Sequence, residues 1–248
     1  PVYEKTTHRD GFVSLEVSPY LAHDRDGTVA EAHRFWHAVS RPNLMIKVPA
    51  TEAGVTAFEE LTAAGVSVNV TLLFAVSRYE AIAEAYVRGL ERRAEAGEPI
   101  DGLASVASFF VSRVDSKVDA QLDEKGRKDL QGKAAVANAR IAYESFERIF
   151  SGPRWEALAA KGAHVQRPLW ASTGVKDPAY SDTRYVVDLV TSNVVNTMPE
   201  ATLDACRDHA EVTGDTIVPE IGNAHAALQA LRDAGIDLDD VVEVLEQE

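Results

Sequence analysis

Short apolar runs alternate along the chain with longer segments in which apolar residues recur every three or four positions. The short runs predict strands, and the longer segments predict helices between them. The strand candidates span residues 12–17, 44–48, 66–74, 104–111, 168–171 and 194–197. Such alternation is typical of parallel strands joined by right-handed crossovers, which favours a TIM-type barrel or a doubly wound sheet.

Glycine, proline and acidic residues mark the predicted helix ends. Helices are expected at 28–39, 52–64, 78–96, 130–150, 155–161, 201–209 and 223–234. The turn DRDG at 24–27 lacks the spacing of a calcium loop and is expected to start the first of them. The acidic stretch 237–240 is typical of a helix N-terminus, where the helix dipole favours negative charge.

Within each strand, apolar and polar side chains alternate, so one face is apolar and the other polar. The apolar set is Val13, Leu15, Val17, Leu44, Ile46, Val48, Val66, Val68, Val70, Leu72, Ala107, Phe109 and Val111. Parallel sheets are normally covered on both faces by their crossovers. A barrel explains the polar face, since that face would line the interior and the apolar face would lie under helices. We therefore predict an α/β fold of the TIM-type (β/α)8 class.

Composition adds limits on what the chain does. Its 248 residues, 46% apolar, suit a single α/β barrel domain over 1–248. A net charge of −14 disfavours nucleic acid and acidic membranes as partners. No apolar run approaches the roughly 20 residues that span a bilayer. The single cysteine, Cys206, excludes an intrachain disulfide and is expected to be a small buried filler. The expected compartment is the cytoplasm.

Lys47 lies in the middle of an apolar predicted strand. Burial disfavours the charged ammonium, and an uncharged amine can attack a carbonyl to form a Schiff base. Glu16 has the inward parity of the preceding strand and is in reach of Lys47 if the two strands pair. The pair is either an amine and carboxylate couple for catalysis or a buried ion pair that only stabilises the fold.

Other polar residues near strand ends suit a phosphorylated polyol. Asn69 and Thr71 on one strand, with Ser108 and Phe110 on the next, offer hydrogen bonds and an apolar wall. Arg113 can bind phosphate or pair with Asp115, and Ser172 with Lys176 can form a small anion-binding turn.

A metal site is not expected. His33 and His37 have the spacing of metal ligands on one helix face, but no third ligand is evident, so they are interpreted as a solvated face.

Six ordered blocks resemble the transaldolase family, particularly its longer form in actinobacteria. They are VSLEV at 13–17, MIKVPAT at 45–51, VNVTLLF at 68–74, SFFVSRVD at 108–115, WASTGVK at 170–176 and NTMP at 196–199. The resemblance runs over essentially the whole chain. It implies a class I aldolase without metal or organic cofactor. Such an enzyme transfers a dihydroxyacetone unit from sedoheptulose 7-phosphate to glyceraldehyde 3-phosphate in the pentose phosphate pathway.

The resemblance also implies a role for each matched residue. Lys47 would form the Schiff base, and Glu16 with Thr71 would hold the water used in proton transfer. Asn69 and Ser108 would bind hydroxyls of the dihydroxyacetone unit. The remaining matched residues are Phe110 as a pocket wall and Arg113 as a phosphate ligand. Lys176 is the nearest cation to a family arginine that is replaced here.

The family pattern includes two strands before the first block, one with an acid/base aspartate and one with an asparagine. A closed barrel needs about eight strands, and about six are visible. The barrel is therefore expected to be incomplete, with its N-terminal portion and a last helix absent from these 248 residues. Two alternatives stay open: a simple Schiff-base aldolase, and a non-catalytic fragment or pseudoenzyme that binds sugar phosphates. The oligomeric state is not fixed, and a monomer and a homodimer are both compatible.

Overall fold

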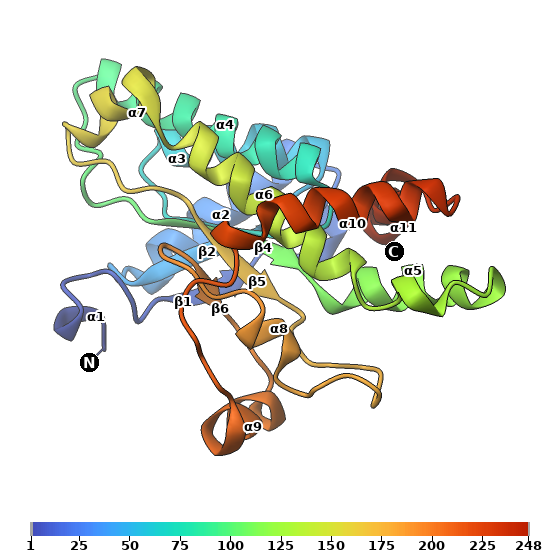
Figure 1. The fold of residues 1–248 in the computed structure, drawn as a ribbon. Coiled ribbons are helices and arrows are strands. Elements are labelled where there is room, and N and C mark those ends of the chain that lie inside the picture. Colours follow the sequence, from blue (N-terminus) through green and yellow to red (C-terminus); the bar gives the residue numbers. More distant parts are fainter. Residues whose placement is uncertain (1, 248) are drawn as a thin grey trace. The chain divides into compact units, whose positions relative to one another are not determined.

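A computed structural model describes residues 2–247 as an α/β fold with six strands in one sheet (Figure 1). The strands are β1 (Val13–Glu16), β2 (Leu44–Pro49), β3 (Val68–Leu73), β4 (Ser105–Phe110), β5 (Arg167–Ala171) and β6 (Val195–Asn196). Their order in the sheet is β1-β2-β3-β4-β5-β6. Sequential order is that of a TIM-type barrel, whereas a doubly wound sheet reverses its order at a switch point. The predicted α/β class and strands are confirmed.

Helices separate the strands nearly as the sequence predicts. They are α1 (Val2–Lys5), α2 (Arg25–Val39), α3 (Glu52–Ala63), α4 (Val76–Glu95), α5 (Ser112–Glu124), α6 (Ala134–Ile149), α7 (Gly152–Ala159), α8 (Arg184–Val187), α9 (Glu200–His209), α10 (Ile221–Asp233) and α11 (Leu238–Gln247). Short 3-10 turns lie at η1 (Pro19–Leu21), η2 (Lys128–Leu130) and η3 (Val218–Glu220). Among residues 2–247 no helix is both long enough and apolar enough to cross a membrane.

The chain divides into two compact units. The first contains residues 2–71, 81–107 and 149–166, and the second contains 72–80, 108–148 and 167–247. Strands β3 and β4 and helix α4 each pass from one unit to the other. The first unit holds β1, β2 and most of β3, and the second holds β5 and β6.

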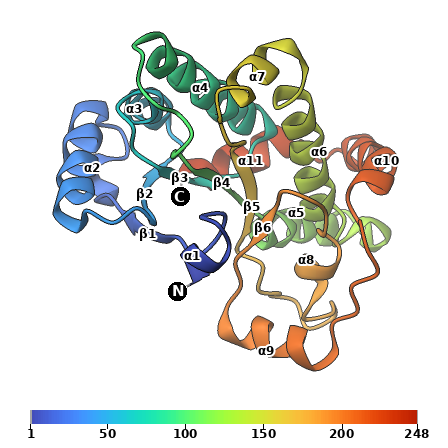
Figure 2. The ribbon, with the colours of Figure 1, turned by 90° about the vertical axis from the view of Figure 1, so that its left-hand side faces the viewer.

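Parallel pairing in the first unit fixes which residues lie opposite one another. Strand β1 pairs with β2 so that Glu16 is in register with Lys47, and β2 pairs with β3 so that Lys47 is in register with Asn69. Opposite residues of a parallel pair point to the same face of the sheet. Figure 2 shows α2 and α3 side by side next to these strands, and both helices contact β2.

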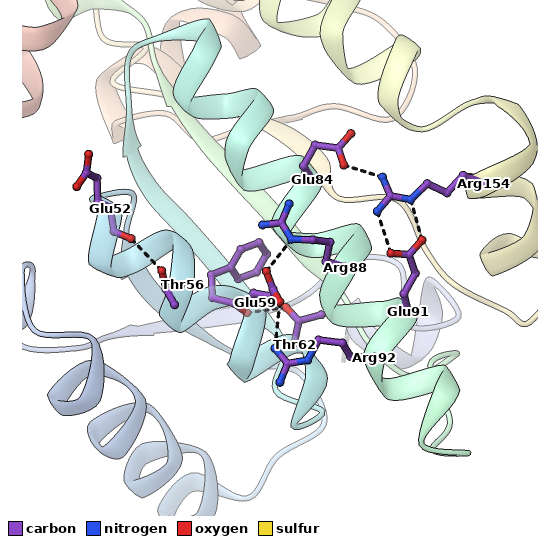
Figure 3. Close-up of polar contacts among 10 residues, drawn as sticks. Glu52, Thr56, Glu59, Thr62, Glu84, Arg88, Glu91, Arg92 and Arg154 are labelled. Carbon is purple, nitrogen blue, oxygen red and sulfur yellow. Dashed lines mark hydrogen bonds and ion pairs between the residues drawn. The ribbon is translucent and has the colours of Figure 1, made fainter.

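Charged side chains join the helices of the first unit on their outer surface (Figure 3). Glu59 of α3 accepts hydrogen bonds from Arg88 at 2.7 Å and from Arg92 at 3.0 Å, both on α4. Burial raises the pKa of Glu59, but these two hydrogen bonds outweigh burial and hold the pKa below its usual range. Arg154 of α7 binds both carboxylate oxygens of Glu91, at 2.7 and 2.8 Å. The network ties α3, α4 and α7 together.

The core of the second unit contains an aromatic cluster. The ring of Phe109 on β4 packs edge-on against Tyr79 and against Trp170, each at a centroid distance of 6.3 Å. All three side chains are fully buried. Tyr79 belongs to α4, so Phe109, which the alternation places on the apolar face, lies under a helix.

Two strands depart from the predicted alternation. In β1 all four residues are exposed, and Val13 keeps 63% of its surface, so helices do not cover its apolar face among residues 2–247. In β3 the pattern breaks at Leu72, which is 40% exposed and has a φ of 61°. That left-handed conformation is costly for a leucine and turns its side chain off the apolar face.

Other differences are smaller. Helix α5 was not among the predicted helices, although Val114, Val118 and Leu122 recur on one face and are fully buried. Cys206 is half-buried rather than buried. The turn at 24–27 does start α2, because Asp24 caps the helix by accepting a hydrogen bond from the Gly27 amide at 2.9 Å.

Close backbone contact at the start of α3 leads to a stability prediction. A methyl group added at Gly54 would lie 1.9 Å from the carbonyl oxygen of Pro49, at the end of β2. The carbonyl oxygen belongs to the backbone and cannot move aside as a flexible side chain would. Gly54→Ala is therefore expected to lower the free energy of unfolding by about 3 kcal/mol. Urea unfolding measures the change. Gly102→Ala is the matched control, because nothing lies within 4 Å of its added methyl. Equal effects of the two substitutions would contradict the packing argument.

Candidate active site

Lys47 and Glu16 are in contact on neighbouring strands of the first unit. The Nζ atom of Lys47 lies 3.1 Å from Oε2 of Glu16. The side chains retain 29% and 48% of their exposure, respectively, so both can meet a ligand. A pair this exposed adds little to stability, because water screens the attraction. The pair is therefore not a buried ion pair, and its contribution to holding the fold together is small.

Strand β3 adds two polar side chains on the same face as Lys47. Asn69, in register with Lys47, donates from Nδ2 to the Ser14 hydroxyl of β1 at 3.0 Å. Thr71 is in register with Pro49 and is fully buried. Its hydroxyl has no hydrogen-bond partner among residues 2–247. An unpaired buried hydroxyl is costly, so a bound water or ligand would relieve it.

The remaining predicted residues belong to the second unit. Ser108 is buried on β4, and Phe110 is half-buried with its ring 5.2 Å from that of Phe74. Arg113 is exposed, and its guanidinium lies 5.3 Å from the centre of the Phe110 ring. It occupies the first turn of α5, whose N-cap residue Val111 provides no side-chain hydrogen bond. The positive end of a helix dipole attracts anions, and Arg113 adds a full positive charge.

The suggested pairing of Arg113 with Asp115 is wrong. Asp115 instead accepts hydrogen bonds from the Ala135 amide at 2.8 Å and from the Tyr185 hydroxyl at 2.7 Å. Burial raises the pKa of Asp115, and these two hydrogen bonds oppose that rise. No salt bridge to Arg113 is found within residues 2–247, so its guanidinium is available to an anion.

Ser172 follows β5 and lies against the start of α5. Its carbonyl accepts a hydrogen bond from the Ser112 amide, and the hydroxyls of the two serines are 3.0 Å apart. Ser172 has a φ of 55°, so the chain turns sharply there. Lys176, four residues on, is exposed and lines a pocket of about 660 Å³ together with Asp119 and Tyr180.

One neighbour of these residues, Ser14, had only a weak signal in the sequence. Ser14 holds Asn69, yet it looks like any polar residue of an edge strand. The alternation in β1 places Ser14 and Glu16 on one face, and that parity was the available clue.

His33 and His37 lie with their rings 6.0 Å apart, and the described residues contain no cluster of three potential metal ligands.

Comparison with known proteins gives the family. The sequence model of the transaldolase/fructose-6-phosphate aldolase family matches residues 3–248. Transaldolase 1 of Streptomyces avermitilis is 55% identical over 251 residues, which cover 100% of this chain and 66% of that protein. A transaldolase of Saccharopolyspora erythraea is 57% identical over 240 residues, covering 96% of this chain and 66% of that protein. A transaldolase of Thermobifida fusca is 53% identical, covering 100% and 68%.

The chain thus spans about two thirds of the length of the curated relatives that it matches. Identity above 50% across that length and a family match over nearly all 248 residues both support one family assignment for the chain. The chain belongs to the transaldolase/fructose-6-phosphate aldolase family.

Proposed function

We propose that this protein is a transaldolase that works through a Schiff base on Lys47. The observation that carries the proposal is the 3.1 Å contact between the Lys47 amine and the Glu16 carboxylate. Asn69 lies beside the pair in register, and Thr71 follows along the same strand. An amine next to a carboxylate can exchange protons with it, and imine formation from a ketone requires such an exchange.

The chemistry follows from the properties of an imine. Lys47 adds to the ketone carbon of a ketose phosphate, and loss of water gives a protonated imine. That imine accepts the electron pair of the bond between the third and fourth carbons, so the bond breaks to an aldehyde and an enamine. The enamine then attacks a second aldehyde, and water releases the new ketose and the free lysine. Glu16 and Thr71 hold the water that gains and loses the protons.

The other predicted residues bind the rest of the sugar. Asn69 and Ser108 receive the hydroxyls of the dihydroxyacetone unit, and Phe110 forms an apolar wall. Arg113, Ser172 and Lys176 bind the phosphate. Support comes from the exposed guanidinium of Arg113 and from its place in the first turn of α5. An arginine can bind phosphate through two parallel hydrogen bonds, whereas a lysine acts as a point charge.

Sedoheptulose 7-phosphate as donor and glyceraldehyde 3-phosphate as acceptor fit this scheme, which places the protein in the pentose phosphate pathway. The lysine carries the intermediate, so the proposed reaction uses no metal or organic cofactor. The single cysteine is typical of a reducing compartment such as the cytoplasm. We also propose that the chain forms part of one (β/α)8 domain, supported by the sequential strand order.

Borohydride trapping tests the proposal. Incubation with fructose 6-phosphate and then borohydride is expected to reduce the imine and leave a stable adduct on Lys47, because borohydride converts an imine to an amine that cannot hydrolyse. Peptide mass spectrometry locates the adduct. An unlabelled protein, or an adduct on another lysine, would refute the mechanism.

The same preparation separates the alternatives. A transaldolase passes the three-carbon unit to glyceraldehyde 3-phosphate faster than it releases free dihydroxyacetone, and a simple aldolase releases it. A non-catalytic binder gives neither product and no adduct.

A further inference from the structure

Helix α5 carries two carboxylates that bind the same two chain segments. Asp115 and Asp119 lie one helical turn apart and therefore on one face of the helix. Asp119 accepts a hydrogen bond from the Gly132 amide at 2.9 Å and one from the Tyr180 hydroxyl at 2.7 Å. Asp115 accepts equivalent bonds from the Ala135 amide and the Tyr185 hydroxyl. Each carboxylate thus joins one backbone amide at or just before the start of α6 to one tyrosine of the segment around α8.

Arg184 and Gly132 complete the contact around Tyr180. The guanidinium of Arg184 lies 4.6 Å from the centre of the Tyr180 ring, and it donates a hydrogen bond to the Gly132 carbonyl. Gly132 has a φ of 67°, and an added methyl there would lie 2.8 Å from the Tyr180 ring. The ring therefore fits a space that only glycine leaves open. We call Asp119, Gly132, Tyr180 and Arg184 the Tyr180 clamp.

The clamp fixes one end of the segment that carries Lys176. The other end is fixed at Ser172, through its contacts with Ser112 at the start of α5. Lys176 is the one lysine or arginine between these two attachment points. Burial, and then the nearby Asp119, raise the pKa of the Tyr180 hydroxyl, so it stays protonated and remains a hydrogen-bond donor. Both attachment points lie on α5, the helix whose first turn holds Arg113.

We propose that Tyr180 and Asp119 are positioning residues for phosphate: they hold the 172–180 segment on α5 so that Lys176 is oriented toward the phosphate group of the sugar. This proposal rests on the proposed function, since Lys176 is a phosphate ligand only there. If the segment that carries Lys176 were mobile, binding an anion would cost the backbone entropy of ordering that segment. Fixing the backbone before binding removes this cost, which strengthens binding without adding a contact.

The test compares phosphate affinity in full-length protein variants. Tyr180→Phe removes only the hydroxyl and is expected to weaken binding of inorganic phosphate, measured by calorimetric titration, about tenfold. Asp119→Asn should weaken it in the same direction. The KM for fructose 6-phosphate should rise by a similar factor while kcat changes little, because the carbon chemistry is untouched. Tyr20→Phe is the matched control, as Tyr20 is 95% exposed.

A double-mutant cycle with Lys176→Ala separates positioning from general stability. If Tyr180 acts through Lys176, Tyr180→Phe should weaken phosphate binding no further in the Lys176→Ala background. Unchanged phosphate affinity in both Tyr180→Phe and Asp119→Asn would overturn the proposal. So would fully additive losses in the cycle, or a parent protein that binds no phosphate.

Phosphate titration needs no turnover, whereas borohydride labelling with unphosphorylated dihydroxyacetone reports only on Lys47. Absence of labelling in the parent protein would therefore count against the proposed function. A change in the phosphate affinity of the Tyr180 and Asp119 variants, with labelling unchanged, reports on the clamp.

Discussion

Replacing Lys47 with alanine is expected to abolish borohydride labelling and to lower the rate of three-carbon transfer by ~10⁴-fold or more. The reason is that the proposed intermediate is covalent, and no water molecule or neighbouring group can take the place of the amine. The folded state should tolerate the change to within about 1 kcal/mol, because the side chain is partly exposed and its ion pair contributes little. Transfer assays, labelling and urea unfolding measure the three effects.

A second substitution at the same position separates the amine from its charge. Lys47→Arg keeps a cation that can face Glu16, but a guanidinium is too weak a nucleophile to form an imine. It should therefore be as inactive as Lys47→Ala. Lys5→Ala, at an exposed position in α1, should leave activity unchanged. Activity retained in Lys47→Arg would mean that the pair has only an electrostatic role, and the mechanism would be abandoned.

Glu16→Gln is expected to lower kcat by about 10²–10⁴-fold, the range usual for loss of a general acid/base. Glutamine has the same size and can still accept a hydrogen bond from Lys47, so the geometry around Nζ should persist. What is lost is the ability to take up and return protons as the imine forms and hydrolyses. Labelling of Lys47 should still occur, but slowly, and the time course of adduct formation by mass spectrometry measures the delay.

Glu52→Gln provides the comparison for Glu16→Gln. Glu52 is exposed in the first turn of α3, and its substitution removes the same charge without touching the site. A Glu16→Gln variant with the rate constants of Glu52→Gln would show that the carboxylate only balances charge.

Sequence reasoning was most successful where one local rule was enough. Alternation within β1, β2 and β3 predicted that Glu16, Lys47 and Asn69 share a face, and the parallel register places them in one row. Glycine and acidic residues marked most helix ends. These signals depend only on neighbouring residues in the sequence, so they can be used without knowledge of distant contacts.

Contacts between residues far apart in the sequence could not be predicted from such local patterns. Tyr180 and Asp119 are 61 residues apart, and neither residue type nor spacing indicated that they meet. Helix α5 was missed because its many charged residues outweigh a narrow apolar stripe of three residues, although α5 contacts other helices such as α11. Leu72 fits the alternation on paper, but a backbone φ of 61° removes it from the apolar face.

Because Glu16, Lys47 and Asn69 form one row across three strands, the position of each residue along its strand matters as much as its type. Because side chains alternate every residue, deleting one residue of β2 ahead of Lys47 would rotate the lysine to the opposite side and leave the sheet otherwise pairable. Point substitutions elsewhere in β2 can therefore be absorbed gradually, whereas insertions and deletions act as an all-or-none change. Natural variation in this segment should preserve its length more strictly than its composition.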